Sequence, residues 1–208
     1  MSRWDAFYAN SESRGPSALL SRASSLVITS ADIPQAIDLG CGTGKEAQQL
    51  LQAGWNVLAI DNEPEAIART IANCAASSPG ELATLLCDFE RLVELPRSQL
   101  IHAGLALPFC QPARLEQLWH LVLSALEPGG VFVGHFFGVN HAWAALAHLS
   151  FHTEANIRQL CEDLEILMLR ESETPSHTPS GHLNWHRFDV IARKPIEKPS
   201  PPVASAQA

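Results

Sequence analysis

The stretch QAIDLGCGTG, residues 35–44, decides the fold of this chain. It is an apolar run that ends in alternating glycines at positions 40, 42 and 44, and it carries Asp38 two residues before the first of them. Without Cβ atoms, such a turn adopts unusual backbone angles and lets a ligand approach its amides. In a doubly wound α/β sheet the ligand lies at this turn from the first strand into the first helix, where the helix N-terminus favours a carboxylate or a phosphate.

Outward from this turn, apolar runs of strand length alternate with segments of helical period, as in a parallel sheet with crossover helices. We expect strands at residues 35–40, 56–61, 83–87, 100–106, 131–137, 165–170 and 185–193. We expect helices at residues 44–54, 64–76, 115–126 and 153–164. In the second helix, Ile67, Ile71 and Cys74 form one predicted apolar stripe.

Composition and charge limit the possible partners. The chain has 208 residues, 46% of them hydrophobic, which suits one sizeable core. We expect one domain over residues 1–194, with an N-terminal arm at 1–15 lying over the site as a lid and a disordered tail at 195–208. The net charge of −8 disfavours nucleic acid and anionic membranes as partners. Five scattered cysteines, with no signal sequence or spanning segment, favour a soluble cytoplasmic protein, which we expect to be a monomer or a homodimer.

The spacing of the glycines distinguishes between nucleotide ligands. Dinucleotide sites favour G-x-G-x-x-G or a final Ala, and Lys45 stands at that last position here. Asp61 ends the second expected strand about 20 residues after the turn, the reach at which a carboxylate binds ribose hydroxyls. Asp38 would repel a pyrophosphate but attracts an ammonium group. A ligand with a ribose, a carboxylate and an ammonium group is S-adenosylmethionine.

At this point a family resemblance is visible. AIDLGCGTG resembles motif I of the class I S-adenosylmethionine-dependent methyltransferases, and WNVLAIDNEPEAI resembles their acidic second-strand motif. LLCDFERL is similar to their adenine-binding turn and LIHAGLALPF to their fourth-strand motif. RWDAFYANSESRGPS and FDVIARKP resemble one branch, the tellurite-resistance and thiopurine-like small-molecule methyltransferases. The resemblance implies a Rossmann-like, doubly wound α/β sheet of seven strands, mostly parallel with an antiparallel last strand, and helices on both faces.

The resemblance also implies which residues bind the cofactor. The turn of Gly40, Cys41, Gly42 and Gly44 would approach the methionine part, with Asp38 near its amino group. The remaining implied contacts are Asp61 and Asn62 to the ribose, Asp88 to the adenine amino group, Phe89 to the adenine ring, the Ala103 carbonyl to the sulfonium, and Trp4, Tyr8 and Arg14 as an aromatic lid with an arginine for the carboxylate. Gln99 departs from the aspartate that often opens the fourth-strand motif, which puts one local interaction in doubt.

An acceptor pocket is expected above the ends of the fourth and fifth strands. Its candidate residues are Leu107, Pro108, Phe109, His135, Phe136, Phe137 and Trp143, with His182 and His186 close to the same mouth. His135 is the candidate catalytic base, although a histidine in an apolar strand is more often a hydrogen-bonded core or rim residue. No histidine, cysteine or glutamate spacing matches a metal site.

Two alternatives to a methyltransferase stay open. A nicotinamide-dependent reductase shares the turn and the ribose aspartate, but it usually has a catalytic Tyr and Lys pair, and Tyr8 is the lone tyrosine. A non-catalytic module that binds S-adenosylmethionine or S-adenosylhomocysteine would share the same cofactor motifs. Among methyltransferases, a nucleic-acid enzyme is disfavoured because the fourth strand leads into LPF and lacks the turn that holds a flipped base. We therefore expect a small, soft or apolar acceptor.

Overall fold

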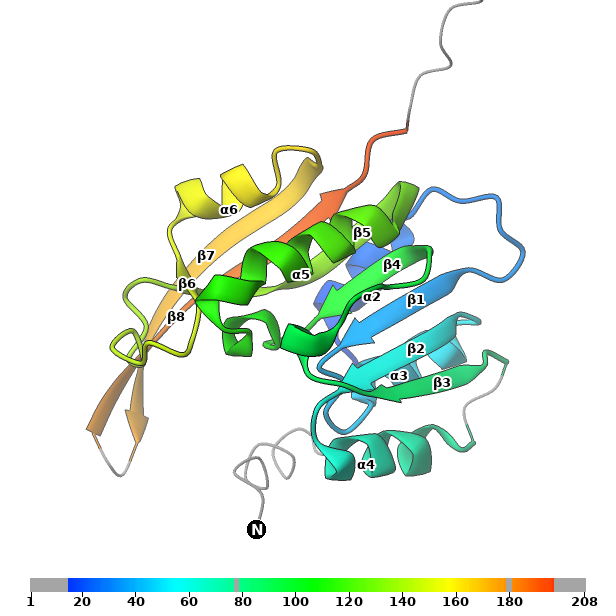
Figure 1. The fold of residues 1–208 in the computed structure, drawn as a ribbon, viewed down its shortest axis with the longest axis horizontal. Helices are drawn as coiled ribbons and strands as arrows, with labels where there is room; N and C mark the ends of the chain where they lie inside the picture. The colour runs from blue at the N-terminus through cyan, green and yellow to red at the C-terminus, as the bar shows by residue number, and fades with distance from the viewer. Residues whose placement is uncertain (1–14, 77–78, 179–180, 197–208) are drawn as a thin grey trace, which may run out of the picture.

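The computed structural model of the protein describes residues 15–76, 79–178 and 181–196, and it is built around one twisted sheet (Figure 1). The strands are β1 (Gln35–Leu39), β2 (Asn56–Asp61), β3 (Leu82–Leu86), β4 (Ser98–Ala103), β5 (Leu126–Gly138), β6 (Phe151–His152), β7 (Glu165–Thr178) and β8 (Gly181–Arg193). The helices are α2 (Ala18–Ser25), α3 (Lys45–Gln52), α4 (Pro64–Cys74), α5 (Pro112–Ala125) and α6 (Glu154–Leu160), with 3-10 turns η1 (Phe89–Arg91) and η2 (Leu107–Phe109).

The strand order is β3-β2-β1-β4-β5-β8-β7, with β6 paired to β5. β8 runs antiparallel to both of its neighbours, and the other pairings are parallel. The doubly wound, mostly parallel sheet with an antiparallel last strand is therefore confirmed, and the two-residue β6 is an addition to the seven expected strands. The order reverses between β1 and β4, so the crevice beyond their carboxyl ends is the switch point where such folds bind ligands.

Helices cover both faces, as expected (Figure 1). α2, α3 and α4 pack on the face that carries Ala36, Val57 and Val133. α5 and α6 pack on the other face, where Trp119 of α5 contacts Phe132 edge-on at 4.8 Å between ring centroids. Trp119 also donates its indole N–H to the carbonyl of Leu160, which ties α5 to α6.

The expected apolar stripe of α4 is wrong in part. Ile71 is 51% exposed, while Ala66, Thr70 and Cys74 form the buried face. The helix is rotated because Thr70 packs against the glycine turn, where a Cβ on Gly44 would lie 2.8 Å from the Cα of Thr70. The turn thus determines which face of α4 is buried.

Several expected boundaries also differ from the structure. α2 was not expected; Ser17 caps it by accepting from the amide of Leu20. β4 ends at Ala103, three residues before the expected end, because a tight turn follows it. β5 begins at Leu126 and takes in the EPGG segment that was expected to separate helix from strand. β7 and β8 form a hairpin much longer than the expected 165–170 and 185–193.

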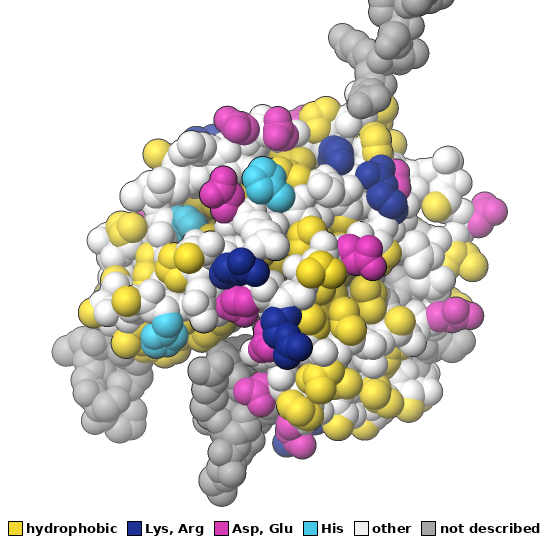
Figure 2. Space-filling view, viewed as in Figure 1, with side chains coloured by type: hydrophobic (Ala, Val, Ile, Leu, Met, Phe, Trp, Pro, Cys, Tyr) yellow, Lys and Arg dark blue, Asp and Glu magenta, His cyan; other side chains and the backbone are white. Residues whose placement is uncertain are grey.

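One face of the sheet lacks a covering helix over β2 and β3, because only the short η1 lies between β3 and β4. Hydrophobic side chains gather on this side of the molecule (Figure 2). Leu85 and Leu86 of β3 are 40% and 53% exposed, and Val93 is 78% exposed. Within the described residues, no helix is both long enough and apolar enough to span a bilayer.

Candidate functional site

The glycine turn follows β1 at the switch point, and its backbone geometry is possible because glycine has no side chain. Gly40, Gly42 and Gly44 have φ of +72°, +55° and +75°, which glycine adopts without steric cost. A Cβ on Gly40 would lie 2.5 Å from the Cβ of Ala106, which follows β4. The turn therefore needs glycine both for its conformation and for the close approach of the segment after β4.

The amides of this turn are used within the chain. Gly40 and Cys41 donate to the carbonyl of Ile60 at 2.8 and 3.0 Å, Gly42 donates to Asp61, and Gly44 donates to the carbonyl of Cys41 at 2.8 Å. The turn thus offers a ligand a bare, closely packed backbone surface more than free amide donors. Polar recognition at this point then depends on the neighbouring carboxylates.

Asp38 is the most informative of these carboxylates. It lies in β1, its side chain is 1% exposed, and its Oδ1 is 2.7 Å from Nδ1 of His102 in the adjacent β4. Its Oδ2 is buried and has no hydrogen-bond partner among the described residues. A buried carboxylate oxygen without a donor is costly unless a ligand completes it. An ammonium group beside the glycine turn fits this oxygen.

His102 was missed by the sequence analysis. It was seen only as part of the apolar run LIHA, and its partner Asp38 is 64 residues away in the chain. The pairing depends on the register of β1 against β4, where Asp38 and His102 are direct partners. A histidine inside an apolar strand was the available signal, but it does not identify the partner.

Asp61 ends β2 and holds the turn in place. Its Oδ2 accepts from the amide of Gly42 at 2.9 Å and its Oδ1 from the amide of Glu63 at 3.0 Å. Burial raises the pKa of Asp61, the two amide hydrogen bonds oppose this shift, and the charge of Asp38 adds to it. Two buried carboxylates therefore lie beside one turn, which makes the crevice favourable to a cation.

The predicted adenine residues lie at the ends of β2 and β3. Asn62 donates to Asp88 at 3.2 Å, which bridges the two strand ends. Phe89 begins η1, and its ring would be 3.7 Å from a Cβ on Gly40. The structure thus brings Asn62, Asp88 and Phe89 to the same edge of the sheet as the glycine turn, in keeping with a nucleoside site.

The turn after β4 is strained and supported by His135. Leu105 has a φ of +56°, and no other described residue except glycine has a positive φ. Its amide donates to Nδ1 of His135 in β5 at 3.2 Å. The carbonyl of Ala103, predicted to face the sulfonium, lies against Gly134 of β5. This turn leads directly into Ala106, which lies against Gly40.

His135 is also tied to a buried ion cluster. Its Nε2 lies 3.5 Å from Oδ1 of Asp189, which is 1% exposed and pairs with Arg170 and Arg187. With Nδ1 accepting from Leu105, the neutral ring carries its proton on Nε2, toward this carboxylate. Both ring nitrogens of the predicted base thus face partners within the chain.

The predicted acceptor residues divide into two groups. Leu107 and Phe136 are buried in the main core, with 0% and 1% exposure. Phe109, Phe137 and Trp143 meet at the end of β5, with centroid distances of 6.0 Å from Phe137 to each of the other two rings. Phe137 is also buried, whereas Phe109 and Trp143 are half-buried, so these two side chains are the better placed to contact a ligand.

Other predicted residues play different parts. His186 is buried, accepts from the amide of Asn140 at 3.0 Å and faces Glu171 at 2.8 Å, so it braces the long hairpin. Trp4, Tyr8 and Arg14 lie outside the described residues, as does the side chain of His182. No group of three or more potential metal ligands occurs in the described part of the chain.

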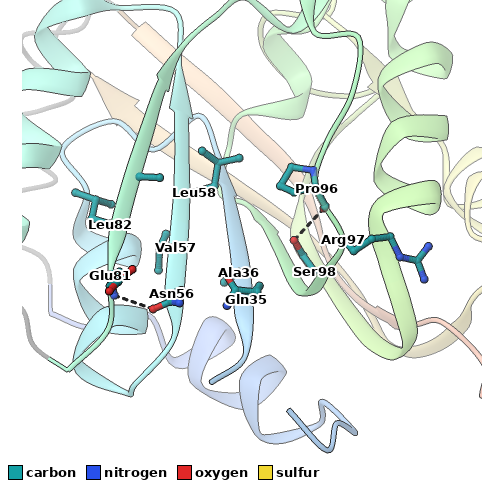
Figure 3. Close-up of a pocket in the computed structure, with 11 residues that line it drawn as sticks. Gln35, Ala36, Asn56, Val57, Leu58, Glu81, Leu82, Pro96, Arg97 and Ser98 are labelled. Atoms are coloured by element: carbon teal, nitrogen blue, oxygen red, sulfur yellow. Dashed lines mark hydrogen bonds between the residues drawn. The ribbon is translucent and has the colours of Figure 1, made fainter. Parts of the chain in front are cut away.

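A groove of about 290 Å³ lies at the opposite end of the sheet (Figure 3). It is lined by the amino ends of β1, β2, β3 and β4, and Asn56 accepts from the amide of Glu81 across it. Ligands of doubly wound sheets bind beyond the carboxyl ends of the strands, where the glycine turn and Asp38 lie. We therefore place the functional site at that end and not in the groove.

The chain is similar to known methyltransferases in sequence and in fold. Residues 36–130 match the family model described as "Methyltransferase domain". The "Probable cobalt-precorrin-6B C(15)-methyltransferase (decarboxylating)" of Methanothermobacter thermautotrophicus is 28% identical over 170 residues, which are 79% of this chain and 81% of that protein. Across the curated relatives it matches, the chain spans between 41% and 81% of their length.

Two solved structures share the fold. TehB from Haemophilus influenzae has a TM-score of 0.75 and 17% identity, over 91% of this chain and 66% of TehB. Magnesium protoporphyrin IX methyltransferase from Synechocystis, solved with bound S-adenosylmethionine, has a TM-score of 0.61 and 16% identity, over 85% of this chain and 75% of that one. At 17% and 16% identity, these likenesses show that the fold is shared.

Proposed function

We propose that this chain, which matches a methyltransferase family model over residues 36–130, is an S-adenosylmethionine-dependent methyltransferase, and that it methylates a soft, flat or apolar small molecule held beside the ends of β4 and β5. The unpartnered Oδ2 of Asp38 is the main observation that supports S-adenosylmethionine as the cofactor. It lies at the glycine turn and suits the ammonium group of the methionine part, whereas it would repel the pyrophosphate of a nicotinamide cofactor.

The remaining cofactor contacts follow from the arrangement of the strand ends. Asp61 would bind the ribose hydroxyls while its present hydrogen bonds hold the turn, and Asn62 lies next to it. Asp88 and Phe89 would contact the adenine. Trp4, Tyr8 and Arg14 remain predictions for the lid and the carboxylate. Gly40 has no Cβ, which allows Ala106 to pack directly against the glycine turn.

The chemistry demands little of the protein beyond alignment. Bound S-adenosylmethionine supplies an activated methyl group. The acceptor's lone pair forms the new bond to the methyl carbon while the C–S bond breaks, and the electron pair of the C–S bond stays on sulfur. The chain's residues must place the acceptor in line with that bond and exclude water, which together lower the barrier by several kcal/mol. Residues 104–106 and the aromatic side chains at the end of β5 are placed for this task.

His135 supports residues 104–106, the segment that follows β4. Its Nδ1 holds the amide of Leu105 and its Nε2 faces Asp189, so we infer a positioning role for it. To act as the predicted base, it would have to release one of these partners. A thiolate or another soft anion needs no base, which agrees with an acceptor of that kind.

We also propose the cellular compartment and the oligomeric state of the protein. The five cysteines are free thiols, and burial raises the pKa of Cys74 to about 11 and that of Cys110 to about 12, so these two thiols stay protonated near pH 7. The free thiols support a reducing compartment, the cytoplasm. The net charge of −8 disfavours a nucleic-acid partner, and we propose a monomer or a homodimer.

Calorimetry and an acceptor screen test the proposal. S-Adenosylhomocysteine should release heat on binding and NADH should not; the reverse would contradict the cofactor assignment. Methyl transfer is then measured with thiols, thiopurines, tellurite, selenite, phenols and amines, and we expect the soft nucleophiles to react. Binding of S-adenosylhomocysteine with no transfer to any of these acceptors would favour a non-catalytic binding module.

A further inference from the structure

Six aromatic rings, including one histidine, contact one another at the carboxyl end of β5. They come from η2, β5, the segment after β5, β6 and β8. We call them the aromatic cluster: Phe109, Phe137, His141, Trp143, Phe151 and Trp185. In the sequence, Phe109 of the cluster follows three residues after Ala106, and Ala106 lies against Gly40 of the glycine turn.

The middle of the cluster is a stacked pair. The rings of Phe137 and His141 have centroids 4.1 Å apart and planes 20° apart, and the two residues are 1% and 3% exposed. Trp143 and Trp185, which are half-buried, contact each other edge-on at 5.9 Å and lie 5.1 and 4.8 Å from His141. A buried stack is thus bordered by partly exposed indole rings.

His141 has a polar group that the protein leaves unused. The amide of Trp143 donates to its Nδ1 at 3.1 Å, so the proton of the neutral ring is on Nε2. Burial lowers the pKa of His141, and the nearby His186 contributes, so the ring is neutral at pH 7. Nε2 is buried and has no hydrogen-bond partner among the described residues. A donor N–H therefore stands among aromatic rings without an acceptor.

We propose that the aromatic cluster recognises the methyl acceptor, and that His141 donates its Nε2–H to it. The acceptor would be a flat aromatic molecule with one hydrogen-bond-accepting atom, such as a heteroaromatic nitrogen, a phenolate oxygen or an aromatic thiolate. Apolar and aromatic walls with one placed polar group are typical of small-molecule sites. This inference rests on the proposed function, whose acceptor it specifies.

The unpartnered N–H of His141 favours an acceptor with a hydrogen-bond-accepting atom over other classes. A cationic amine would present N–H donors to the N–H of His141, leaving both without an acceptor. A purely aliphatic thiol would lose the stacking that aromatic rings provide, since ring pairs attract one another beyond simple burial of area. A flat ring with an accepting atom satisfies both the rings and the donor.

Quinoline and naphthalene form a matched pair of probes, because they share shape and differ in one accepting nitrogen. Their affinities are measured by ligand-observed NMR on the full chain saturated with S-adenosylhomocysteine. We expect the wild-type protein to prefer quinoline about five- to tenfold, the equivalent of one neutral hydrogen bond. His141→Phe keeps the ring and removes the donor, so its preference should fall below about twofold. His148→Phe, an exposed site in the same segment, is the control and should keep the preference.

Equal binding of the two probes by the wild-type protein, or an unchanged preference in His141→Phe, would overturn the inference. A measurement without any variant guards against misfolding: the ¹⁵N resonance of His141 Nε2 should shift with quinoline and stay in place with naphthalene, and no shift with quinoline would overturn the inference too. Binding of S-adenosylhomocysteine is recorded on the same samples. If that ligand binds and the quinoline preference is absent, the inference alone fails; if it does not bind, the proposed function fails as well.

Discussion

The role of His135 can be separated from that of a base by a double-mutant cycle with Leu105. In the structure, Nδ1 of His135 accepts from the amide of Leu105, which is held at a φ of +56°. His135→Ala leaves this amide without its acceptor, which costs about 1–3 kcal/mol. The left-handed conformation of Leu105 itself costs about 1–2 kcal/mol. We expect His135→Ala to lower the free energy of unfolding by about 1–3 kcal/mol and to weaken binding of S-adenosylhomocysteine, because residues 104–106 lose their support.

Leu105→Gly removes the strain, since glycine adopts a positive φ freely. The loss caused by His135→Ala should therefore be smaller in the Leu105→Gly background than in the wild type, by about 1 kcal/mol. Urea unfolding and calorimetry measure the two effects, and His120→Ala, at a side chain 72% exposed, is the control. The positioning role would be refuted if His135→Ala left stability and affinity unchanged but removed one limb of the pH profile of methyl transfer. That result would identify His135 as the base.

Three other predictions concern the site and its surroundings. Gly40→Ala should destabilise the protein by about 2–4 kcal/mol in urea unfolding, because its Cβ would lie 2.5 Å from that of Ala106 in a strained conformation, whereas Gly15→Ala, with no atom within 4 Å, should have little effect. Asp61→Ala should weaken S-adenosylhomocysteine at least tenfold in calorimetry, since charged hydrogen bonds contribute about 1.5–3 kcal/mol each; a change within twofold would disprove the ribose assignment. Burial lowers the pKa of His152 from 6.5 to about 4, so the unfolded chain takes up this proton first as pH falls, and about 1.5–2 kcal/mol of stability should be lost between pH 7 and pH 5. In His152→Phe that part of the loss should be absent; an unchanged pH dependence would show that His152 is not responsible.

The parts of the fold that follow local patterns could be predicted from the sequence. The run from Gln35 through the glycine turn into α3 carries its own signals: an apolar strand, glycines at positive φ and a buried face of Ala47, Leu50 and Leu51. The alternation of strands and helices determined the parallel sheet, because parallel strands need crossover connections. The carboxyl-end location of the candidate site follows from the same topology.

Other parts depend on contacts between distant segments. The pair of Asp38 and His102 requires the register of β1 and β4, which no local pattern specifies. The long β7–β8 hairpin continues through polar residues such as Glu171 and Glu173, so it lacks the alternation that identifies a strand. The hydrogen bond of His135 to Leu105 depends on a tight turn in a non-glycine residue, which propensity does not predict. These are the features that shape the site most closely.

Calorimetry with two ligands tests the central claim, that the carboxylate beside the glycine turn binds the amino-acid end of the donor. S-Adenosylhomocysteine carries the ammonium group and 5′-methylthioadenosine lacks it, while both keep the nucleoside and the sulfur. We predict that Asp38→Asn weakens the first ligand about 10- to 150-fold, as expected for a lost charged contact, and leaves the second within about twofold. Asp32→Asn, at an exposed position, should change neither affinity. An equal loss for both ligands, or no loss for S-adenosylhomocysteine, would contradict the account.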